Sequence, residues 1–295
     1  MCFQQMDSLS FKDGAFYLWN NAMRMPRPFA LRKATANIRS GWFFIIPGLL
    51  LLFLLGLPLL ALFWRAAGKD FFTYALSDTA LMALKLSLVT SLVSVAVSLL
   101  VGTPFAYILT RWEFPGRALF ELLIDLPVVL PPSVAGLALL IAFGRQGLFG
   151  SWLALAGVSL PFTTTAVVIA QTFVSAPLYV RSARLGFAGI DPQLEEAAHV
   201  EGASQWQMFS QVMLPLAWRA LISGAILAWT RALGEFGATI LFAGNLEGLT
   251  QTMPLAIYLG FERNLDVAVV LSVVLILASL ILLVIMRNMD EIKVY

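Results

Sequence analysis

Long apolar stretches recur along the chain, and shorter polar stretches separate them. A helix needs about 20 mostly apolar residues to cross the hydrocarbon core of a bilayer. The pattern therefore predicts an all-α, polytopic membrane protein with about six transmembrane helices. The predicted spans cover residues 42–64, 84–109, 120–143, 161–180, 214–242 and 267–286.

The N-terminal part of the chain differs from the rest. Residues 1–40 mix aromatic and basic side chains and are predicted to form a tail before a transmembrane domain over residues 41–290. Residues 28–40 fit an interfacial helix on the membrane surface. A poorly ordered leader, or a start codon assigned upstream of Met23 or Met25, explains the tail equally well. The first span has no cleavage-like end and exceeds a signal-peptide core, so it is expected to remain as an anchor.

The composition agrees with a membrane domain. The chain of 295 residues is 60% hydrophobic and 12% charged, whereas soluble domains average roughly 45–50% apolar and about 25% charged residues. The net charge is only +2 and the basic residues form no patch, which argues against a nucleic-acid partner. Cys2 is the only cysteine, so a disulfide framework and a cysteine metal site are excluded.

The basic residues predict the orientation. Six spans place both termini on one side, and loops on the cytoplasmic side carry an excess of Lys and Arg. The predicted inner segments contain twelve such residues and the outer loops contain four. Both termini and the loop at about residues 181–213 are therefore predicted to be cytoplasmic. The inner set is Lys12, Arg24, Arg27, Arg32, Lys33, Arg39, Arg111, Arg117, Arg181, Arg184, Arg287 and Lys293; the outer set is Arg65, Lys69, Arg145 and Arg263.

Prolines are concentrated in the third predicted span, which contains Pro127, Pro131 and Pro132. Each proline removes a helix hydrogen bond. Irregular backbone at membrane depth survives only against protein or a water-filled cavity. A single kink would be ordinary, but three prolines within six residues favour the wall of a translocation pathway.

The loop between the fourth and fifth predicted spans is much longer than a connection requires, because packed helices need only about 2–8 linking residues. Asp191 followed by Pro192 predicts an N-cap and a first-turn proline. Glu195 and its neighbour Glu196 then lie near the positive end of the helix dipole. Gly202 is placed to end this helix in the left-handed conformation.

A second helix is predicted directly after that turn. Ser204 followed by Gln207 forms a capping box, and Trp206, Phe209 and Met213 follow at helical spacing. Pro215 then opens the fifth span. Small residues on the first helix, Ala197, Ala198 and Gly202, would allow another surface to approach closely. The loop is either a hairpin that packs on its own bundle or a docking surface for a separate cytoplasmic protein.

The loop resembles the permease subunits of prokaryotic ABC importers. The resemblance rests on Glu196-Ala197-Ala198, Gly202, Val212 and Leu214-Pro215, with Val212 where isoleucine is commoner. It implies a plasma (inner) membrane protein whose residues 192–201 form a coupling helix seated in a cleft of an ATPase subunit. The residues implied in coupling are Pro192, Glu195, Glu196, Ala197, Ala198, Glu201, Gly202, Trp206 and Pro215.

The chain has no phosphate-binding loop of its own, because Gly68-Lys69 is followed by Asp70 and lacks the upstream glycine. ATP and Mg²⁺ are therefore expected on a partner ATPase, with no cofactor in this chain. An extracytoplasmic oxyanion-binding protein and a second copy of the permease are the other expected partners. The chain is expected to be a transport subunit and not an enzyme.

A narrower resemblance concerns the cargo. Residues 231–258, 124–136 and 144–150 resemble the molybdate-type branch of the sulfate and molybdate permeases. The resemblance implies import of a tetrahedral oxyanion, with molybdate or tungstate first and sulfate or thiosulfate as the alternative.

Ionisable and small residues of the fifth span are the pathway candidates. Arg231 and Glu235 are four residues apart, which would place them on one helix face, and charges at this depth usually face the bundle interior. They form either an internal ion pair that fixes packing or part of the pathway. The full candidate set is Arg231, Gly234, Glu235, Gly237, Thr239, Pro131 and Pro132, with Gln171, Asn245, Thr250 and Gln251 as further polar candidates.

Other chemistry is weakly indicated. His199 is the only histidine and is interpreted as a solvated or interface residue. No carboxylate cluster has metal-ligand spacing, and no catalytic constellation is found. An ion-coupled secondary carrier would call for paired broken helices in two repeats, and a membrane-embedded enzyme for clustered His, Asp or Glu. Neither alternative explains the loop that ends at Pro215.

Overall fold

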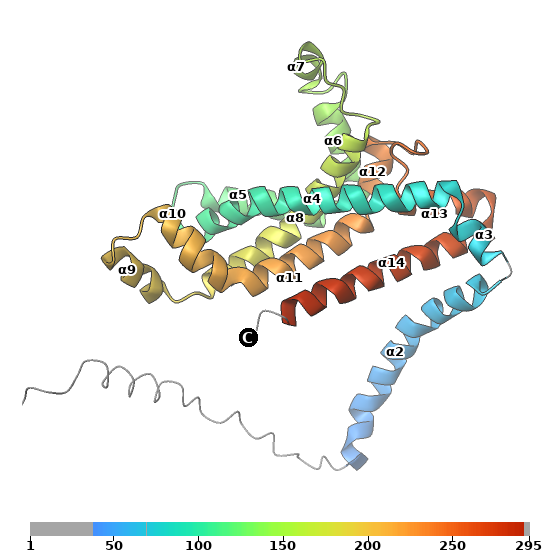
Figure 1. Cartoon of the computed structure of the whole chain (residues 1–295), viewed down its shortest axis with the longest axis horizontal. Helices are drawn as coiled ribbons and strands as arrows, with labels where there is room; N and C mark the ends of the chain where they lie inside the picture. The colour runs from blue at the N-terminus through green and yellow to red at the C-terminus, as the bar shows by residue number, and fades with distance from the viewer. Residues whose placement is uncertain (1–37, 69, 292–295) are drawn as a thin grey trace, which may run out of the picture. The chain divides into compact units, whose positions relative to one another are not determined.

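The computed structural model describes residues 38–68 and 70–291, which are mainly helical and contain no strand (Figure 1). The all-α prediction is thereby confirmed. Residues 1–37 lie outside the described part of the chain, as does nearly all of the predicted interfacial helix. The chain divides into two units at residue 59, and each is described by itself.

The first unit contains most of helix α2, Ile38–Ala66. Its leucines are exposed, with Leu50 and Leu52 at 67% and 69%. An apolar helix with this exposure suits contact with lipid tails. Pro47 and Pro58 lie inside the helix without ending it. The predicted first span is thus a continuous helix.

The second unit holds the remaining helices. In chain order these are α3 Phe71–Ala75, α4 Asp78–Arg111, α5 Arg117–Val129, α6 Pro132–Phe143, α7 Gly150–Leu155, α8 Thr164–Ala188, α9 Pro192–Val200, α10 Gln205–Gln207, the π-helix η1 Met208–Met213, α11 Leu214–Leu233, α12 Gly237–Phe242, α13 Met253–Arg263 and α14 Leu265–Glu291.

Four described helical segments are long and apolar enough to cross a membrane: Ile45–Ala66, Asp78–Arg111, Thr164–Ala188 and Gln205–Leu233. They correspond to the first, second, fourth and fifth predicted spans. The sixth prediction lies within α14, Leu265–Glu291, whose described apolar segment is Leu265–Ile281. The third prediction fits less well, because residues 120–143 form a bent pair of helices that counts as one span only if the pair is taken together.

Helices α4, α8 and α11 pack side by side in the centre of the unit (Figure 1). Small residues allow their backbones to approach closely. A Cβ atom on Gly186 of α8 would lie 2.5 Å from Cβ of Ala220 on α11, and one on Gly224 would lie 2.7 Å from Cβ of Ser182. Apolar burial does not drive helix association in lipid, so close van der Waals packing must do so.

Hydroxyl groups on α4 add directed contacts to this packing. The indole Nε1 of Trp229 donates to Ser91 Oγ at 3.1 Å, and the backbone N–H of Met253 donates to Ser87 Oγ at 2.7 Å. Thr172 Oγ1 on α8 donates to Ser94 Oγ at 3.0 Å. Such bonds between membrane helices contribute about 1 kcal/mol each. The serine side of α4 therefore fixes its rotation against its neighbours.

Two helix breaks meet on the other side of the unit, and they correct two predicted spans. The third span is interrupted at Pro131 and Pro132, and α5 and α6 enclose a bend of 120°. The fifth span ends at Leu233, and α12 begins only after a break at residues 234–236. Proline at the first break and glycine at the second disfavour a continued helix. In Figure 1, α12 lies beside α6, and both helices pack against α8 in one buried cluster.

Candidate functional site

The start of α9 has the predicted N-terminal geometry. The Asp191 carboxylate accepts a hydrogen bond from the backbone N–H of Gln193 at 3.0 Å, and Pro192 occupies the first helical turn. The side chain thus satisfies one of the free amides that every helix start leaves. Glu195 follows in the first turn, where its charge suits the helix dipole.

The end of α9 is a Schellman turn at Gly202. Its φ is +83°, the left-handed conformation predicted from the sequence. The N–H of Gly202 donates to the His199 carbonyl and the N–H of Ala203 donates to the Ala198 carbonyl, both at 3.0 Å. This pair of bonds is the defining pattern of the motif. The helix is therefore fixed at both ends by local contacts.

The capping box after that turn is also confirmed. The backbone N–H of Ser204 donates to Gln207 Oε1 at 2.8 Å, and the N–H of Gln207 donates to Ser204 Oγ at 3.3 Å. Two free amides are satisfied reciprocally. The turn between the two helices therefore has a defined geometry.

The second loop helix is not separate from the fifth span, contrary to the prediction. Helical structure is continuous over Gln205–Leu233, and the segment Met208–Met213 is wound as a π-helix. Pro215 has no N–H to donate to the preceding turn, and the widened turns lie directly before it. The winding leaves Met208 and Met213 fully buried while Trp206 is 72% exposed.

Arg111 holds the inner side of α9. Its Nε lies 2.6 Å from Glu195 Oε1, and both side chains are less than one-fifth exposed. Its Nη2 also donates to the carbonyls of Phe187 at 3.0 Å and Ile190 at 2.9 Å. One guanidinium thereby joins the ends of α4 and α8 to α9.

Sequence reasoning missed this role, because Arg111 was used only as a loop charge. Its position in the last turn of the long helix α4 was the available signal, since cations are favoured near helix C-termini. Glu195, one of the residues implied in coupling, is turned toward Arg111.

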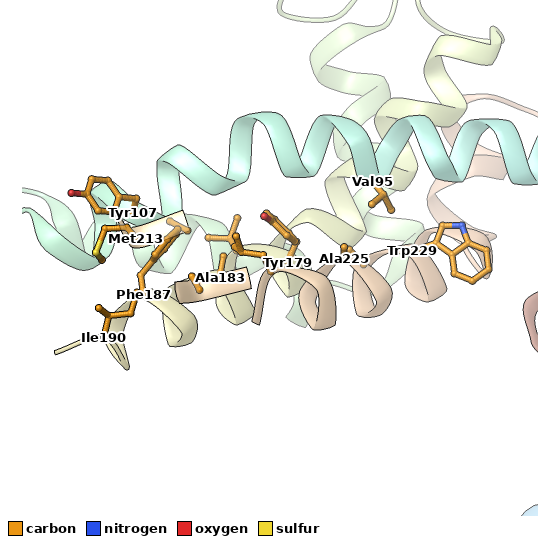
Figure 2. Packing of buried hydrophobic residues seen from close by; sticks show 14 of the residues in the cluster. Val95, Tyr107, Tyr179, Ala183, Phe187, Ile190, Met213, Ala225 and Trp229 are labelled. Carbon is orange, nitrogen blue, oxygen red and sulfur yellow. The ribbon is translucent and has the colours of Figure 1, made fainter. Parts of the chain in front are cut away.

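Aromatic and sulfur-containing side chains fill the space under α9. Ring centroids of Tyr107 and Phe187 are 5.6 Å apart, and those of Tyr107 and Phe209 are 5.1 Å apart. Figure 2 shows Tyr107, Met213, Phe187 and Ile190 gathered at one end of the buried cluster. Ala198 packs against this cluster from α9. Such aromatic pairs favour a fixed geometry.

The outer side of α9 is exposed and partly apolar. Val200 is 89% exposed and Leu194 is 47% exposed. Of the predicted coupling residues, Ala198 and Glu195 are half-buried against the chain itself. The others are exposed: Pro192, Glu196, Ala197, Glu201, Gly202, Trp206 and Pro215.

Arg231 and Glu235 form an ion pair, although not on one helix as predicted. Nη1 of Arg231 lies 2.6 Å from Glu235 Oε2, but Glu235 is in the break between α11 and α12. Its other oxygen accepts a hydrogen bond from the N–H of Ala238 at 2.8 Å. Glu235 is 1% exposed and Arg231 is 34% exposed. The carboxylate thus links the end of α11 to the start of α12.

The remaining pathway candidates lie at or near the helix breaks. A Cβ on Gly237 would lie 2.6 Å from Cβ of Pro132, and one on Gly136 would lie 2.8 Å from the Ala238 carbonyl oxygen. The structure therefore brings Gly237 and Pro132 together. Gly234 caps α11 and Pro131 precedes α6.

Several polar candidates are buried. Thr239 and Gln171 have fully buried side chains whose polar atoms have no hydrogen-bond partner among the described residues. Thr250 Oγ1 accepts from the N–H of Leu246 at 2.9 Å, so it stabilises its own loop. Asn245 has a buried carbonyl oxygen without a partner in the same part of the chain.

Comparison with known proteins adds the family. Residues 98–291 match the family described as "Binding-protein-dependent transport system inner membrane component". The chain belongs to this family. It is thus a permease subunit of an ABC importer, as its coupling-loop residues implied, and its relatives are inner-membrane components.

Two of the three relatives described here are named for a cargo, one for molybdenum and one for sulfate. The permease is 41% identical over 236 residues to the "Molybdenum transport system permease protein ModB" of Mycobacterium tuberculosis, which covers 79% of this chain and 89% of the relative. It is 37% identical over 232 residues to the "Probable transport system permease protein NifC" of Clostridium pasteurianum, covering 78% and 81%. It is 37% identical over 231 residues to the "Sulfate transport system permease protein CysT" of Escherichia coli, covering 77% and 83%.

Solved structures share the fold of the permease at low sequence identity. A bacterial ABC transporter that imports the acidic polysaccharide alginate matches with a TM-score of 0.73 at 17% identity, over 88% of this chain and 98% of that chain. The MetNI methionine ABC transporter in an inward-facing conformation matches with a TM-score of 0.55 at 18% identity, over 73% and 98%.

Proposed function

We propose that the permease imports a tetrahedral oxyanion, with molybdate or tungstate as cargo. The observation that carries this proposal is the 41% identity to a protein named as a molybdenum transport permease, over most of both chains. Sulfate is the second candidate, because the sulfate permease CysT is 37% identical. The residues that resemble the molybdate branch, 231–258, include the Arg231–Glu235 pair.

The identity of the transported anion can be tested by measuring uptake into proteoliposomes that contain the full transporter. Labelled molybdate uptake should be ATP-dependent and should be inhibited by tungstate at lower concentration than by sulfate. Stronger inhibition by sulfate than by tungstate would assign the permease to the sulfate group. Titration of the associated binding protein with the three anions provides an independent check.

The exposed side of α9 is proposed to dock into a partner ATPase that binds ATP and Mg²⁺. Three features support this assignment. The helix is fixed at Asp191 and Gly202, it is tied to the bundle through Arg111, and its outer surface exposes Val200 and Leu194. A helix that is rigidly attached on one side and exposed on the other can transmit movement. An external binding protein is a further proposed partner, since a matching alginate transporter is described in complex with a periplasmic protein.

The permease is proposed to act as a homodimer on two ATPase subunits, with both termini and the α9 loop in the cytoplasm. One chain presents one α9 surface, and closed two-fold symmetry is the common way to supply a pair. Light scattering of the purified complex should give a mass with two permease chains and two ATPases. A mass with one permease chain per two ATPases would contradict the proposal.

The ion pair of Arg231 and Glu235 is proposed to position α12 beside the pathway. Glu235 is fully buried and has both oxygens engaged by the chain. Its negative charge is therefore compensated within the chain, whereas the guanidinium of Arg231 is one-third exposed. In this arrangement Arg231 still attracts an anion, and the negative charge of Glu235 weakens that attraction.

A further inference from the structure

A cavity of about 770 Å³ lies between the loop that follows α6 and the segment that precedes α8. Most of its wall is apolar, and polar groups form a smaller part of it. The residues of interest are Gly144, Arg145, Gln146, Gly147, Ser159 and Thr163. None of them was among the pathway candidates.

The loop that carries Arg145 and Gln146 is held in one conformation. The N–H of Leu148 donates to the Ile141 carbonyl at 3.0 Å, and the N–H of Gly147 donates to the Gly144 carbonyl at 2.9 Å. A Cβ on Gly147 would lie 2.3 Å from the Ile141 carbonyl oxygen, so this turn requires glycine. The tip of the loop is therefore presented by a braced backbone.

The hydrogen-bond donors of Arg145 and Gln146 at the tip of this loop have no acceptor within the described part of the chain. Among residues 38–68 and 70–291, the Arg145 guanidinium has neither an ion pair nor a hydrogen bond. The backbone N–H groups of Arg145 and Gln146 also have no acceptor in that part of the chain. Thr163 differs, because its hydroxyl donates to the Leu160 carbonyl and accepts from the N–H of Ala166. The uncommitted donors are thus those of Arg145 and Gln146, beside Ser159.

The cavity wall also contacts the region of the helix breaks. Phe162 lines the cavity, and its N–H donates to the carbonyl of Phe242 at the end of α12 at 3.3 Å. A Cβ on Gly244 would lie 2.9 Å from the Phe162 ring. The other end of α12 is held by Glu235. A short packed element therefore connects this cavity to the Arg231–Glu235 pair.

We propose that this cavity is a low-affinity receiving site for the tetrahedral oxyanion on its way to the pathway. The inference rests on the proposed function. A guanidinium presents several N–H donors in a geometry that suits an oxyanion, and adjacent backbone N–H groups add neutral donors. Arg145 is exposed, so water screens its charge and the anion is not retained. Weak binding suits a site that must release its cargo onward.

The test uses the complete transporter with its binding protein and ATPase in proteoliposomes. Arg145→Gln should lower oxyanion uptake about tenfold at subsaturating loaded binding protein, because an uncompensated charge in a cleft raises the local anion concentration by that order. Arg145→Lys should recover part of the rate. Arg263→Gln is the matched control, since Arg263 is likewise exposed and has no ion pair among the described residues. It should leave uptake unchanged.

Docking of the loaded binding protein and its stimulation of ATP hydrolysis should persist in Arg145→Gln. Loss of both would show that Arg145 contacts the binding protein and would overturn the inference. Wild-type uptake in Arg145→Gln would overturn it as well. Absence of oxyanion uptake by the unmodified transporter would instead refute the proposed function, so the two failures are distinguishable.

Discussion

The region around Arg111 and the region of the two helix breaks hold helix ends together in opposite ways. Around Arg111, large side chains connect the helix ends. The guanidinium contacts two carbonyls and a carboxylate, and aromatic rings fill the remaining space. At the breaks, backbones touch directly because Gly136 and Gly237 have no side chains. The first region should therefore be sensitive to loss of atoms, and the second to added atoms or to an unpaired charge.

The largest effect is expected for Arg231→Ala. The change leaves the Glu235 carboxylate, 1% exposed, without its partner, and a stranded buried charge costs about 3–5 kcal/mol. Oxyanion uptake into proteoliposomes should fall below a tenth of the wild-type rate, since a tenfold loss corresponds to only about 1.4 kcal/mol.

The double variant Arg231→Ala/Glu235→Ala separates two roles of this pair. Recovery of part of the uptake would indicate that the pair is structural. Continued inactivity, with ATP hydrolysis still responsive to the loaded binding protein, would indicate that Arg231 attracts the anion. Normal uptake in the single variant would contradict both readings.

Gly237→Val tests the sensitivity to added atoms. Its Cβ would lie 2.6 Å from that of Pro132, and overpacking of this kind costs about 1–3 kcal/mol. Thermal unfolding of the purified permease should occur at lower temperature. Gly56→Val is the control, because nothing lies within 4 Å of the corresponding Cβ position. Equal unfolding temperatures for Gly237→Val and wild type would mean that the breaks are not tightly packed.

Arg111→Ala tests the sensitivity to lost atoms. Glu195 would lose its partner and two carbonyls would lose a donor. Both charges are slightly solvated, so we expect about 2 kcal/mol of destabilisation, below the about 3–5 kcal/mol of a fully buried pair. ATP hydrolysis should become independent of the binding protein. Arg117→Ala, which breaks a pair with Glu121 that is about one-third exposed, should cost less than about 1 kcal/mol. An equal loss of stability in the two variants would remove the distinction.

Gly202→Leu should have a smaller effect, confined to the α9 turn. A side chain in the left-handed conformation costs roughly 1–2 kcal/mol, and no neighbour lies within 4 Å to add a clash. Membrane insertion should be normal, while co-purification of the ATPase or coupled transport should be reduced. Asn tolerates this conformation better, so Gly202→Asn should be milder. Normal transport and normal co-purification in Gly202→Leu would refute the coupling assignment.

Val200→Asp should leave the stability of the isolated permease within about 0.5 kcal/mol, as is usual for surface substitutions. The side chain is 89% exposed, so the change acts only where a partner covers it. Co-purification of the ATPase should decrease. Unchanged binding of the ATPase would place the docking surface elsewhere than on the outer side of α9.

Local signals in the sequence were sufficient for α9. Asp191, Gly202 and Ser204 act through hydrogen bonds to residues at most five positions away, and Pro192 acts through its fixed backbone angle in the first turn, so their roles follow from spacing alone. The apolar pattern likewise located the long helices, because length and composition decide whether a helix can span a bilayer.

Features that depend on distant residues were not predictable in the same way. Periodicity treated residues 120–143 and 214–242 as single spans, although both are broken where Gly237 meets Pro132. Charge counting placed Arg111 in a loop and gave no indication that Glu195 would turn inward. Both errors have one cause: the partner of each residue is more than 75 positions away in the chain.

The contacts of Arg111 have a mechanical consequence. Because the Arg111 side chain contacts α9 and the ends of two long helices, we expect a displacement of α9 to move α4 and α8 together. We expect the resulting deformation at the helix breaks, where the chain is already interrupted and short helices meet at Gly136 and Gly237. The described helices are thus joined by side-chain contacts around Arg111 and interrupted at Pro132 and Gly237.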